Sequence, residues 1–369
     1  MDVVELTQQL VQIDSQNPPG NEKGVARLVF DFLEDKGFSP ELVKTGENRF
    51  NVVAGLGSGP DGLMLNGHMD TVPIGEGWTV EPLGGTVKAG RLYGRGSNDM
   101  KGGIAAVLKA VEGLAREKLK RKLLLTFVAD EEVGGKFGTN WLIKNRPELF
   151  KGVNHGVVAE PSGMHLRIAQ KGFFHFRVKF KGKAAHGSVP ELGDNAILRA
   201  SDFIQETKKL AQEIAKVKDE LLGPGTINIG KIAGGVKVNI VPDRCEVEVD
   251  RRIVPPENAE AAKKQFEKML ERLGHKAEIE PMRVARNPIK ISEGSRIVKE
   301  ILALWPSAKL KSFSGYTELE KYSRDMSVEC VAFGPGSGRT AHSVDEYTEI
   351  GQLKAAVGVF EKLVRKWCL

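Results

Sequence analysis

The chain has 369 residues, of which 41% are hydrophobic and 28% are charged, and its formal net charge is +6. A chain of this length is too long for one ordinary domain, so we expect two. It contains no run of 18 apolar residues, and its N-terminus has no basic segment followed by an apolar one. We therefore expect neither a membrane span nor a signal peptide, and a cytoplasmic location.

The distribution of the basic residues and of the cysteines argues against nucleic-acid binding, disulfides and a cysteine metal site. The densest basic stretch, Lys118–Lys122 (KLKRK), is short, has no interleaved aromatic residues and precedes an apolar run. Such a stretch is typical of a solvated turn as much as of a nucleic-acid surface. The three cysteines, Cys245, Cys330 and Cys368, are scattered and form no CxxC pair. We expect no nucleic-acid partner, no disulfide and no cysteine metal site.

The first half of the chain alternates between helical and strand-like patterns. Amphipathic helices are predicted over Val3–Ile13 and Glu22–Lys36, separated by a Pro-Pro-Gly turn. A further helical stretch covers Gly103–Lys118. Four apolar runs predict strands, and they are NVVAGLG, LMLNGHMD, LLLTFVADEE and GVVAEP. This alternation predicts an α/β fold with a mixed, mostly parallel sheet flanked by helices.

From Gly172 to about Met282 the pattern changes to that of an α+β unit. Helices are predicted over Asn195–Lys216 and Ala259–Leu273. Four alternating runs predict antiparallel strands, and they are FFHFRVKFKG, TINIGKIAGG, CEVEVDRRIV and KAEIEP. After this segment, the strand-like run SVECVAFGPG and a closing helix over Ile350–Val364 return to the strand and helix pattern of the first half. We therefore predict that residues 172–285 form a domain inserted into a catalytic domain made of residues 1–171 and 286–369.

Acids and histidines follow the predicted strands of the first half. The run LMLNGHMD ends in His68 and Asp70, LLLTFVADEE ends in three acids from Asp130 to Glu132, and GVVAEP ends in Glu160. Because the carboxyl ends of strands in an open α/β sheet converge on one crevice, these groups should meet there. Several carboxylates in one crevice repel unless cations compensate them. With two loop residues added, the set suits zinc or a similar divalent ion, and it comprises His68, Asp99, Glu132, Glu160 and His342.

Each of these residues also has a simpler interpretation. A single histidine such as His68 or His342 is more often a hydrogen-bonded structural residue than a ligand. A Glu-Glu pair after a strand is usually an exposed turn, and Asp99 in a glycine-rich loop is a candidate cap for the following helix. These interpretations would have to hold at five places at once. The adjacent pair Glu131-Glu132 also suits one metal ligand beside one proton acceptor, so we favour the metal site.

Several strings occur in a fixed order from residue 66 to residue 347, and they are GHMDTVP, GRGSNDMKGG, ADEEVGG, AEP, GKAAHGSVPELGDNAI, GGVKVNIVPD and GPGSGRTAHSVDEY. Together they resemble the zinc-dependent aminoacylase and carboxypeptidase family, which includes acetylornithine deacetylase and succinyl-diaminopimelate desuccinylase. The resemblance implies a fold of the co-catalytic zinc exopeptidase type, with an inserted dimerisation or lid domain of ferredoxin-like type, and a homodimer.

The resemblance also implies a division of roles at the metal site. Asp99 would bridge two metal ions, with His68 and Glu160 completing one site and Glu132 and His342 the other. Zinc is expected, with cobalt and manganese as alternatives. The sequence neighbour of one ligand, Glu131, would be the general base.

Four further residues are assigned through the same resemblance. Asp70 would orient His68 through its second ring nitrogen. His186 would reach across a dimer interface to stabilise the oxyanion, and Asn239 and Arg252 would bind the substrate. The simpler interpretation of Arg252 is a solvated strand residue.

One loop departs from the family pattern. Where the family commonly has a Gly-Gly-Thr-Asp-Ala type of loop, this chain has Ser314-Gly315-Tyr316-Thr317-Glu318. Gly315 and Thr317 fit, and Gly315 is expected to bind substrate, whereas Tyr316 is bulkier than expected and Glu318 is longer by one methylene. The loop helps to form the substrate pocket in relatives, so the resemblance does not extend to side-chain preference.

Three functional hypotheses follow. The first is hydrolysis of the amide bond of an N-acyl amino acid, such as N-acetyl- or N-succinyl-ornithine, -lysine or -diaminopimelate, in amino-acid biosynthesis. The second is a metallo-carboxypeptidase or dipeptidase that uses the same two metals on short peptides. The third is a metal-free binding protein that keeps the fold, which the complete ligand set and the neighbouring base disfavour.

Overall fold

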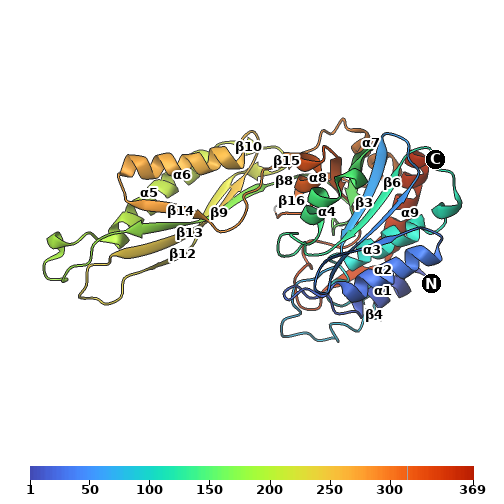
Figure 1. Cartoon of the computed structure of the whole chain (residues 1–369), viewed down its shortest axis with the longest axis horizontal. Helices are drawn as coiled ribbons and strands as arrows, with labels where there is room; N and C mark the ends of the chain where they lie inside the picture. The colour runs from blue at the N-terminus through green and yellow to red at the C-terminus, as the bar shows by residue number, and fades with distance from the viewer. Residues whose placement is uncertain (314) are drawn as a thin grey trace. The chain divides into compact units, whose positions relative to one another are not determined.

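The computed structural model describes residues 1–313 and 315–369, and Ser314 lies outside the described residues. The chain forms two compact units (Figure 1). Unit 1 comprises Met1–Ile168, Ile291–Lys311 and Thr317–Leu369, and unit 2 comprises Ala169–Lys290 and Ser312–Tyr316. The insertion predicted for residues 172–285 lies inside unit 2.

The sheet of unit 1 has the strand order β1-β2-β6-β3-β7-β17-β8. The strands β6, β3, β7 and β17 are parallel to one another, and β1, β2 and β8 add antiparallel pairs. Every residue of β3 and β6 is buried, as in parallel sheets covered on both faces. The strands are β1 (Glu41–Gly46), β2 (Arg49–Leu56), β3 (Gly62–His68), β6 (Leu123–Val128), β7 (Val153–Val158), β8 (Leu166–Gln170) and β17 (Glu329–Ala332).

Helices pack on this sheet, and α3 is one of them. It contacts β3, α1 and α9, and almost all of its residues are buried. Gly103 permits this approach, because a Cβ at that position would lie 2.1 Å from the main-chain oxygen of Ala159. The helices are α1 (Val3–Val11), α2 (Lys23–Asp35), α3 (Lys101–Val111), α4 (Thr139–Asn145), α7 (Arg296–Leu304), α8 (Leu319–Asp325) and α9 (Ile350–Cys368), with short 3-10 turns at Leu114–Arg116 and Pro147–Phe150.

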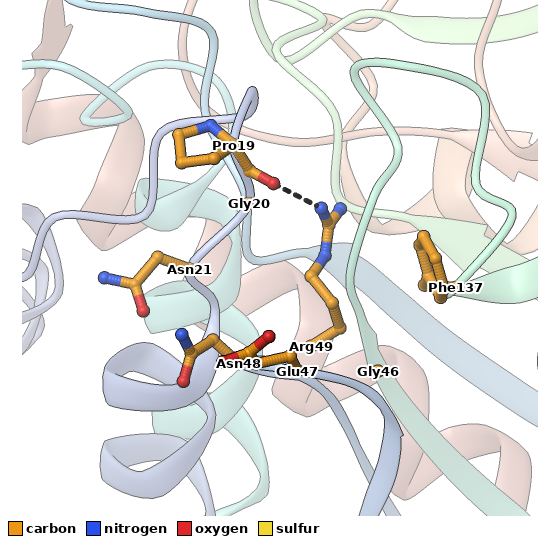
Figure 2. A pocket seen from close by; sticks show the side chains of 8 residues that line it. All are labelled: Pro19, Gly20, Asn21, Gly46, Glu47, Asn48, Arg49 and Phe137. Carbon is orange, nitrogen blue, oxygen red and sulfur yellow. Dashed lines mark hydrogen bonds between the residues drawn. The ribbon is translucent and has the colours of Figure 1, made fainter.

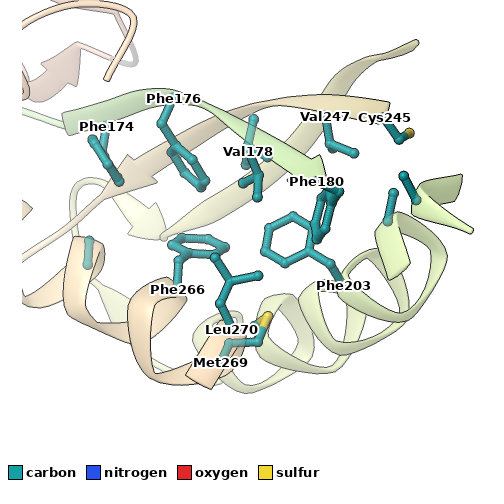
Figure 3. Close-up of a cluster of buried hydrophobic side chains, with 14 of the residues drawn as sticks. Phe174, Phe176, Val178, Phe180, Phe203, Cys245, Val247, Phe266, Met269 and Leu270 are labelled. Carbon is teal, nitrogen blue, oxygen red and sulfur yellow. The ribbon is translucent and has the colours of Figure 1, made fainter. Parts of the chain in front are cut away.

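Unit 2 has the order strand, helix, two strands, helix, strand. Its sheet is antiparallel with the order β12-β13-β9-β14, which is the ferredoxin-like arrangement. Alternate residues of β9 point to the helices, where rings from the sheet and both helices form a separate core that includes Phe176, Phe203 and Phe266 (Figure 3). The elements are β9 (Gly172–Lys181), α5 (Ala196–Ile214), β12 (Thr226–Gly234), β13 (Arg244–Ile253), α6 (Ala259–Leu273) and β14 (Ala277–Pro281).

Shorter strands complete the two units. They are β4 (Thr86–Lys88), β5 (Arg91–Tyr93) and β18 (Tyr347–Glu349) in a three-stranded sheet, β10 (Lys218–Asp219) paired with β11 (Gly223–Pro224), β15 (Ile289–Lys290) paired with the end of β8, and β16 (Leu310–Phe313), with one 3-10 turn at Pro190–Leu192. The three cysteines are buried and have free thiols. None of the described helices is both long and apolar enough to cross a membrane.

The predicted fold class, a mixed and mostly parallel α/β sheet flanked by helices, is confirmed by this arrangement. One predicted element is too long. The helix expected to reach Lys118 ends at Val111 and is followed by a 3-10 turn, because Gly113 interrupts the helical stretch.

Candidate metal centre

The predicted metal ligands lie at one edge of the sheet of unit 1. His68 is the last residue of β3, and Glu132 and Glu160 follow β6 and β7. These three strands are parallel neighbours, so their carboxyl ends open on the same edge. Asp99 precedes α3, and His342 lies in the loop between β17 and β18. Residues from five segments of the chain therefore converge.

Asp99 lies between the two histidines. Its Oδ1 is 3.1 Å from Nε2 of His68, and its Oδ2 is 3.4 Å from Nε2 of His342. The same ring nitrogen of His342 lies 3.2 Å from Oε2 of Glu132. One ligand atom each from His68, Asp99 and Glu132 lies within 4.8 Å of the others. A carboxylate that offers one oxygen to each side is suited to bridge two cations.

The fifth predicted ligand, Glu160, is buried beside this group. Burial raises its pKa to about 8, and the negative charge of Asp99 is the next contribution. Glu132 supports a metal site independently. Its Oε1 is buried and has no hydrogen-bond partner among the described residues, an arrangement that is costly unless a cation satisfies it. The residues present therefore fit a divalent metal ion.

Two of the simpler interpretations, those of Asp99 and of the Glu-Glu pair, do not hold. The N-cap of α3 is Met100, and Asp99 makes no capping bond. The side chain of Glu132 is only 7% exposed, so the Glu-Glu pair is not a solvated turn.

The electrostatics of the group show how strongly its charges interact. Hydrogen bonds that Asp99 and Glu132 accept from His342 raise the pKa of His342 to about 10. Burial alone would lower the pKa of His68, but contacts with Asp70 and Asp99 raise it well above its usual value. Burial raises the pKa of Glu131 well above its usual value. Without a cation, the cluster retains protons that a metal ion would replace.

Asp70 joins a ligand to the turn that carries the predicted base. Its carboxylate accepts the main-chain N–H groups of Glu131 at 3.0 Å and Glu132 at 3.2 Å, and the side-chain amide of Asn17 at 2.8 Å. Nδ1 of His68 is 3.0 Å from the main-chain oxygen of Asp70 and 3.6 Å from its Oδ1. The nearer acceptor is thus the main chain, and orientation of the ring by the carboxylate stays a prediction.

Glu346 is a supporting residue that the sequence interpretation missed. It is 1% exposed, and its Oε1 accepts the main-chain N–H groups of Gly96, Asn98 and Asp99, each at 3.0 Å. Its other oxygen pairs with Arg95. This carboxylate therefore holds the loop that carries the bridging ligand. Its only signal in the sequence is its place in the string AHSVDEY.

Asp130, which the sequence interpretation grouped with the acids of the crevice, supports the turn that carries Glu131. It has a left-handed φ of 69° and accepts hydrogen bonds from Arg49, Asn17 and the main chain of Phe137. Arg49 also donates to the main-chain oxygen of Pro19 beside a cavity of about 580 Å³ (Figure 2). The described lining of that cavity includes none of the five predicted ligands.

The residues predicted to contact substrate belong to unit 2. His186 is exposed, its Nδ1 lies 2.7 Å from the hydroxyl of Ser188, and its segment pairs with that of Asn239 through an N–H···O bond of 2.9 Å from Gly187. Arg252 is the penultimate residue of β13, where it pairs with Asp250 at 2.9 Å and is 27% exposed. These roles stay predictions.

In the loop that departs from the family pattern, Gly315 is exposed. The ring of Tyr316 packs edge-on against Phe173, with their centroids 5.4 Å apart. The predicted role of Gly315 in substrate binding also stays a prediction.

Comparisons with known proteins agree on one family. The family model described as Peptidase family M20/M25/M40 matches residues 64–366. Acetylornithine deacetylase from Myxococcus xanthus is 34% identical over 352 residues, covering 91% of this chain and 90% of that protein. A probable succinyl-diaminopimelate desuccinylase from Staphylococcus aureus (strain N315) is 29% identical, covering 97% and 96%.

Solved structures agree on the fold. An M20 family metallo-carboxypeptidase from Sulfolobus solfataricus has a TM-score of 0.79 at 19% identity and covers 100% of this chain and 99% of its own. A dinuclear metal-binding peptidase of the M20 family from Bacillus subtilis has a TM-score of 0.73 at 15% identity, with 98% and 96% covered.

Substitution of Glu346 tests its supporting role. Glu346→Ala removes the acceptor of three main-chain amides, so the loop of Asp99 loosens and metal affinity should fall ~10–100-fold. The affinity is measured by competition with a chromophoric chelator. Glu349→Ala is the control, because that side chain lies three residues further along the chain, in β18, and is 41% exposed. Equal affinities in the two variants would contradict the role.

Metal binding should release protons and strengthen as the pH rises. In the metal-free chain, His342 with a pKa of about 10 and Glu160 with a pKa of about 8 are both protonated at neutral pH, and a cation must displace those protons. Calorimetric titration in buffers of different ionisation enthalpy measures the release, which should be smaller for His342→Ala. Binding that is independent of pH and releases no protons would refute this.

The same shift affects the stability of the metal-free chain. Because folding raises the pKa of His342 from 6.5 to about 10, its contribution is fully present below pH 6.5 and is lost as the pH rises toward 10.

Proposed function

Because the chain belongs to Peptidase family M20/M25/M40, we propose that it removes the acyl group from an N-acetyl or N-succinyl derivative of ornithine, lysine or diaminopimelate. The family resemblance that the motifs predicted is confirmed. The chain is a metal-dependent amidohydrolase, and the acyl-amino-acid substrate is the proposal. It is carried by the identity of 34% to acetylornithine deacetylase over 91% of the chain.

The proposed metal site uses the five residues at the sheet edge. His68 and Glu160 would hold one ion, Glu132 and His342 the other, and Asp99 would bridge them. When bound, two divalent ions at such a site supply a water whose pKa is lowered toward neutrality. Zinc suits the two imidazoles, and the three carboxylates also accommodate cobalt or manganese.

The chain's own groups then move the proton. Glu131 accepts a proton from the attacking water and delivers it to the leaving amine. Its main-chain N–H is held by Asp70 at 3.0 Å, so the base and the His68 ligand share one support. The amide bond of the substrate is cleaved to a carboxylic acid and an amino acid.

Residues of unit 2 are proposed to recognise the substrate. An arginine fork at Arg252 suits the α-carboxylate of the amino-acid half, with Asn239 and Gly315 beside the substrate. His186 would donate a hydrogen bond to the oxyanion. We assign to residues 172–285 the roles of a dimerisation and lid domain.

The proposed dimer uses the edge strand of that domain. β12 lies at the edge of its sheet, and large apolar side chains are exposed on and after it, with Val236 88% and Val238 101% exposed. An exposed apolar strand edge favours pairing with another chain, here a second copy. The exposed His186 in the same unit is then available to a neighbouring subunit.

A carboxypeptidase or dipeptidase activity is the second candidate. It is supported by the likeness to the metallo-carboxypeptidase of Sulfolobus solfataricus, with a TM-score of 0.79, although 19% identity supports the fold alone. The bond attacked is an amide in both cases, so the metal centre serves either reaction. The third hypothesis, a metal-free binding protein, is wrong, because the chain is a metal-dependent hydrolase.

A substrate panel distinguishes the two activities. The protein is loaded with zinc or cobalt and assayed on N-acetyl- and N-succinyl-ornithine, -lysine and -diaminopimelate, together with dipeptides, by detecting the freed amine. We expect the highest kcat/KM on one of the acyl-amino acids. Turnover confined to dipeptides would overturn the proposal in favour of the peptidase.

Substitution of Glu131 tests the assignment of the base. Glu131→Gln should retain both ions and lose turnover by ~10²–10⁴-fold, because the amide cannot accept the proton. Elemental analysis reports the metal content. The neighbouring change Glu132→Gln is the matched control, since it should weaken metal binding instead. Activity close to wild type in Glu131→Gln would show that another group is the base.

Mixed dimers test the reach of His186. His186→Ala subunits should lose ~100-fold or more in kcat, and Glu131→Gln subunits are also nearly inactive. If His186 serves the neighbouring subunit, each mixed dimer has one site with both residues intact. Equal mixing should then restore about a quarter of the wild-type turnover, since about half of the dimers are mixed. No recovery, with mixed dimers seen by native mass spectrometry, would place His186 in its own subunit's site.

A further inference from the structure

Glu318, the longer acid in the departing loop, is buried in unit 1 as half of an ion pair. Its Oε1 lies 3.0 Å from Nζ of Lys321, which is in the first turn of α8, and the exposed fractions of the two side chains are 1% and 0%. Two charges removed from water are stable only when further hydrogen bonds satisfy both of them. The hydrogen-bond partners of this pair therefore indicate which segments of the chain it supports.

On the acid side, the pair is connected to the strand that ends in a predicted ligand. The hydroxyl of Thr139 donates to Glu318 and lies 3.0 Å from the hydroxyl of Tyr322. The side-chain amide of Asn66 donates to that tyrosine at 2.8 Å. Asn66 is in β3, two residues before His68. The chain of hydrogen bonds thus ends beside the metal ligand.

On the basic side, the pair supports the turn that starts at the proposed base. Nζ of Lys321 donates to the main-chain oxygen of Gly134 at 3.3 Å, and Gly134 donates its own N–H to the main-chain oxygen of Glu131 at 3.0 Å. Gly135 follows with a φ of +72°, and a Cβ there would lie 2.1 Å from Nζ of Lys321. The lysine fits tightly beneath the turn because this residue is a glycine.

We propose that the buried pair of Glu318 and Lys321 positions Glu131, by fixing the turn of residues 131–135 relative to β3 and its ligand His68. Both members are positioning residues, because both are shielded from solvent. Lys321 contacts the turn directly, and Glu318 is connected to the strand through Thr139 and Tyr322. An aspartate at position 318 would be one methylene shorter and would not keep both Lys321 and Thr139 without movement of the main chain. The inference rests on the proposed role of Glu131 as the general base.

The first test separates positioning from binding in the metal-loaded, full-length protein. Lys321→Met should lower kcat ~10–100-fold, because small misplacement of a reacting group has effects of that size, while KM changes by less than about threefold. The metal content should stay at the wild-type value. Lys321→Arg should restore most of the turnover. A change in KM alone, or loss of the ions, would overturn the proposal.

A double-mutant cycle with Glu131→Gln is the decisive test. If Lys321 acts through Glu131, then Lys321→Met should not lower the residual turnover further once the base is absent. An equal fold loss in both backgrounds would mean a general structural effect and overturn the proposal. Wild-type activity of Glu131→Gln alone would instead refute the base assignment, so the two failures are distinguishable.

Two more variants test whether a loss of activity comes from misfolding. Glu318→Asp keeps the charge and shortens the side chain, so kcat should fall by a smaller factor than in Lys321→Met, again with KM nearly constant. Ile301→Ala removes buried volume in α7, away from the turn, and serves as a stability control that should keep the wild-type kcat. A Glu318→Asp protein with unchanged kcat would count against the proposal.

Discussion

The main constraint on unit 1 is the electrostatic repulsion among the carboxylates gathered at one edge of its sheet, which the surrounding groups must compensate. Asp99, Glu132 and Glu160 lie side by side with little or no solvent, and carboxylates so placed cannot all be ionised without compensation. Burial raises the pKa of Glu160, with the charge of Asp99 as a further cause, and hydrogen bonds to Asp99 and Glu132 raise the pKa of His342. A divalent cation compensates the carboxylates, so the same repulsion that makes the arrangement costly makes it selective for metal.

Buried polar groups around these carboxylates hold the main-chain segments that carry them. Asp70 is bonded to the main chain of the base turn, and Glu346 is bonded to the main chain of the Asp99 loop. The pair of Glu318 and Lys321 lies beneath the same turn. Bonds to main-chain groups are effective supports, because they fix the position of a loop whatever side chains it carries.

The metal centre and the proposed recognition residues belong to units with separate cores. All five predicted ligands and Glu131 lie in unit 1, on a buried parallel sheet, whereas His186, Asn239 and Arg252 lie in unit 2, whose core is a cluster of phenylalanine rings. Function depends on the site and not on the fold, so the likeness to a metallo-carboxypeptidase at 19% identity concerns the fold alone.

Local patterns predicted most of the elements and the candidate metal ligands. The helix Ala259–Leu273 has its predicted bounds, because amphipathic spacing, the cap at Asn258 and the glycine at 274 are all local. The convergence of the candidate ligands at the strand ends was also predictable, because parallel strands open on one edge. Only the tertiary structure identified Glu346, Lys321 and the support role of Glu318. In the sequence these are ordinary charged residues, and their burial depends on main-chain partners such as that of Glu346, 250 positions away.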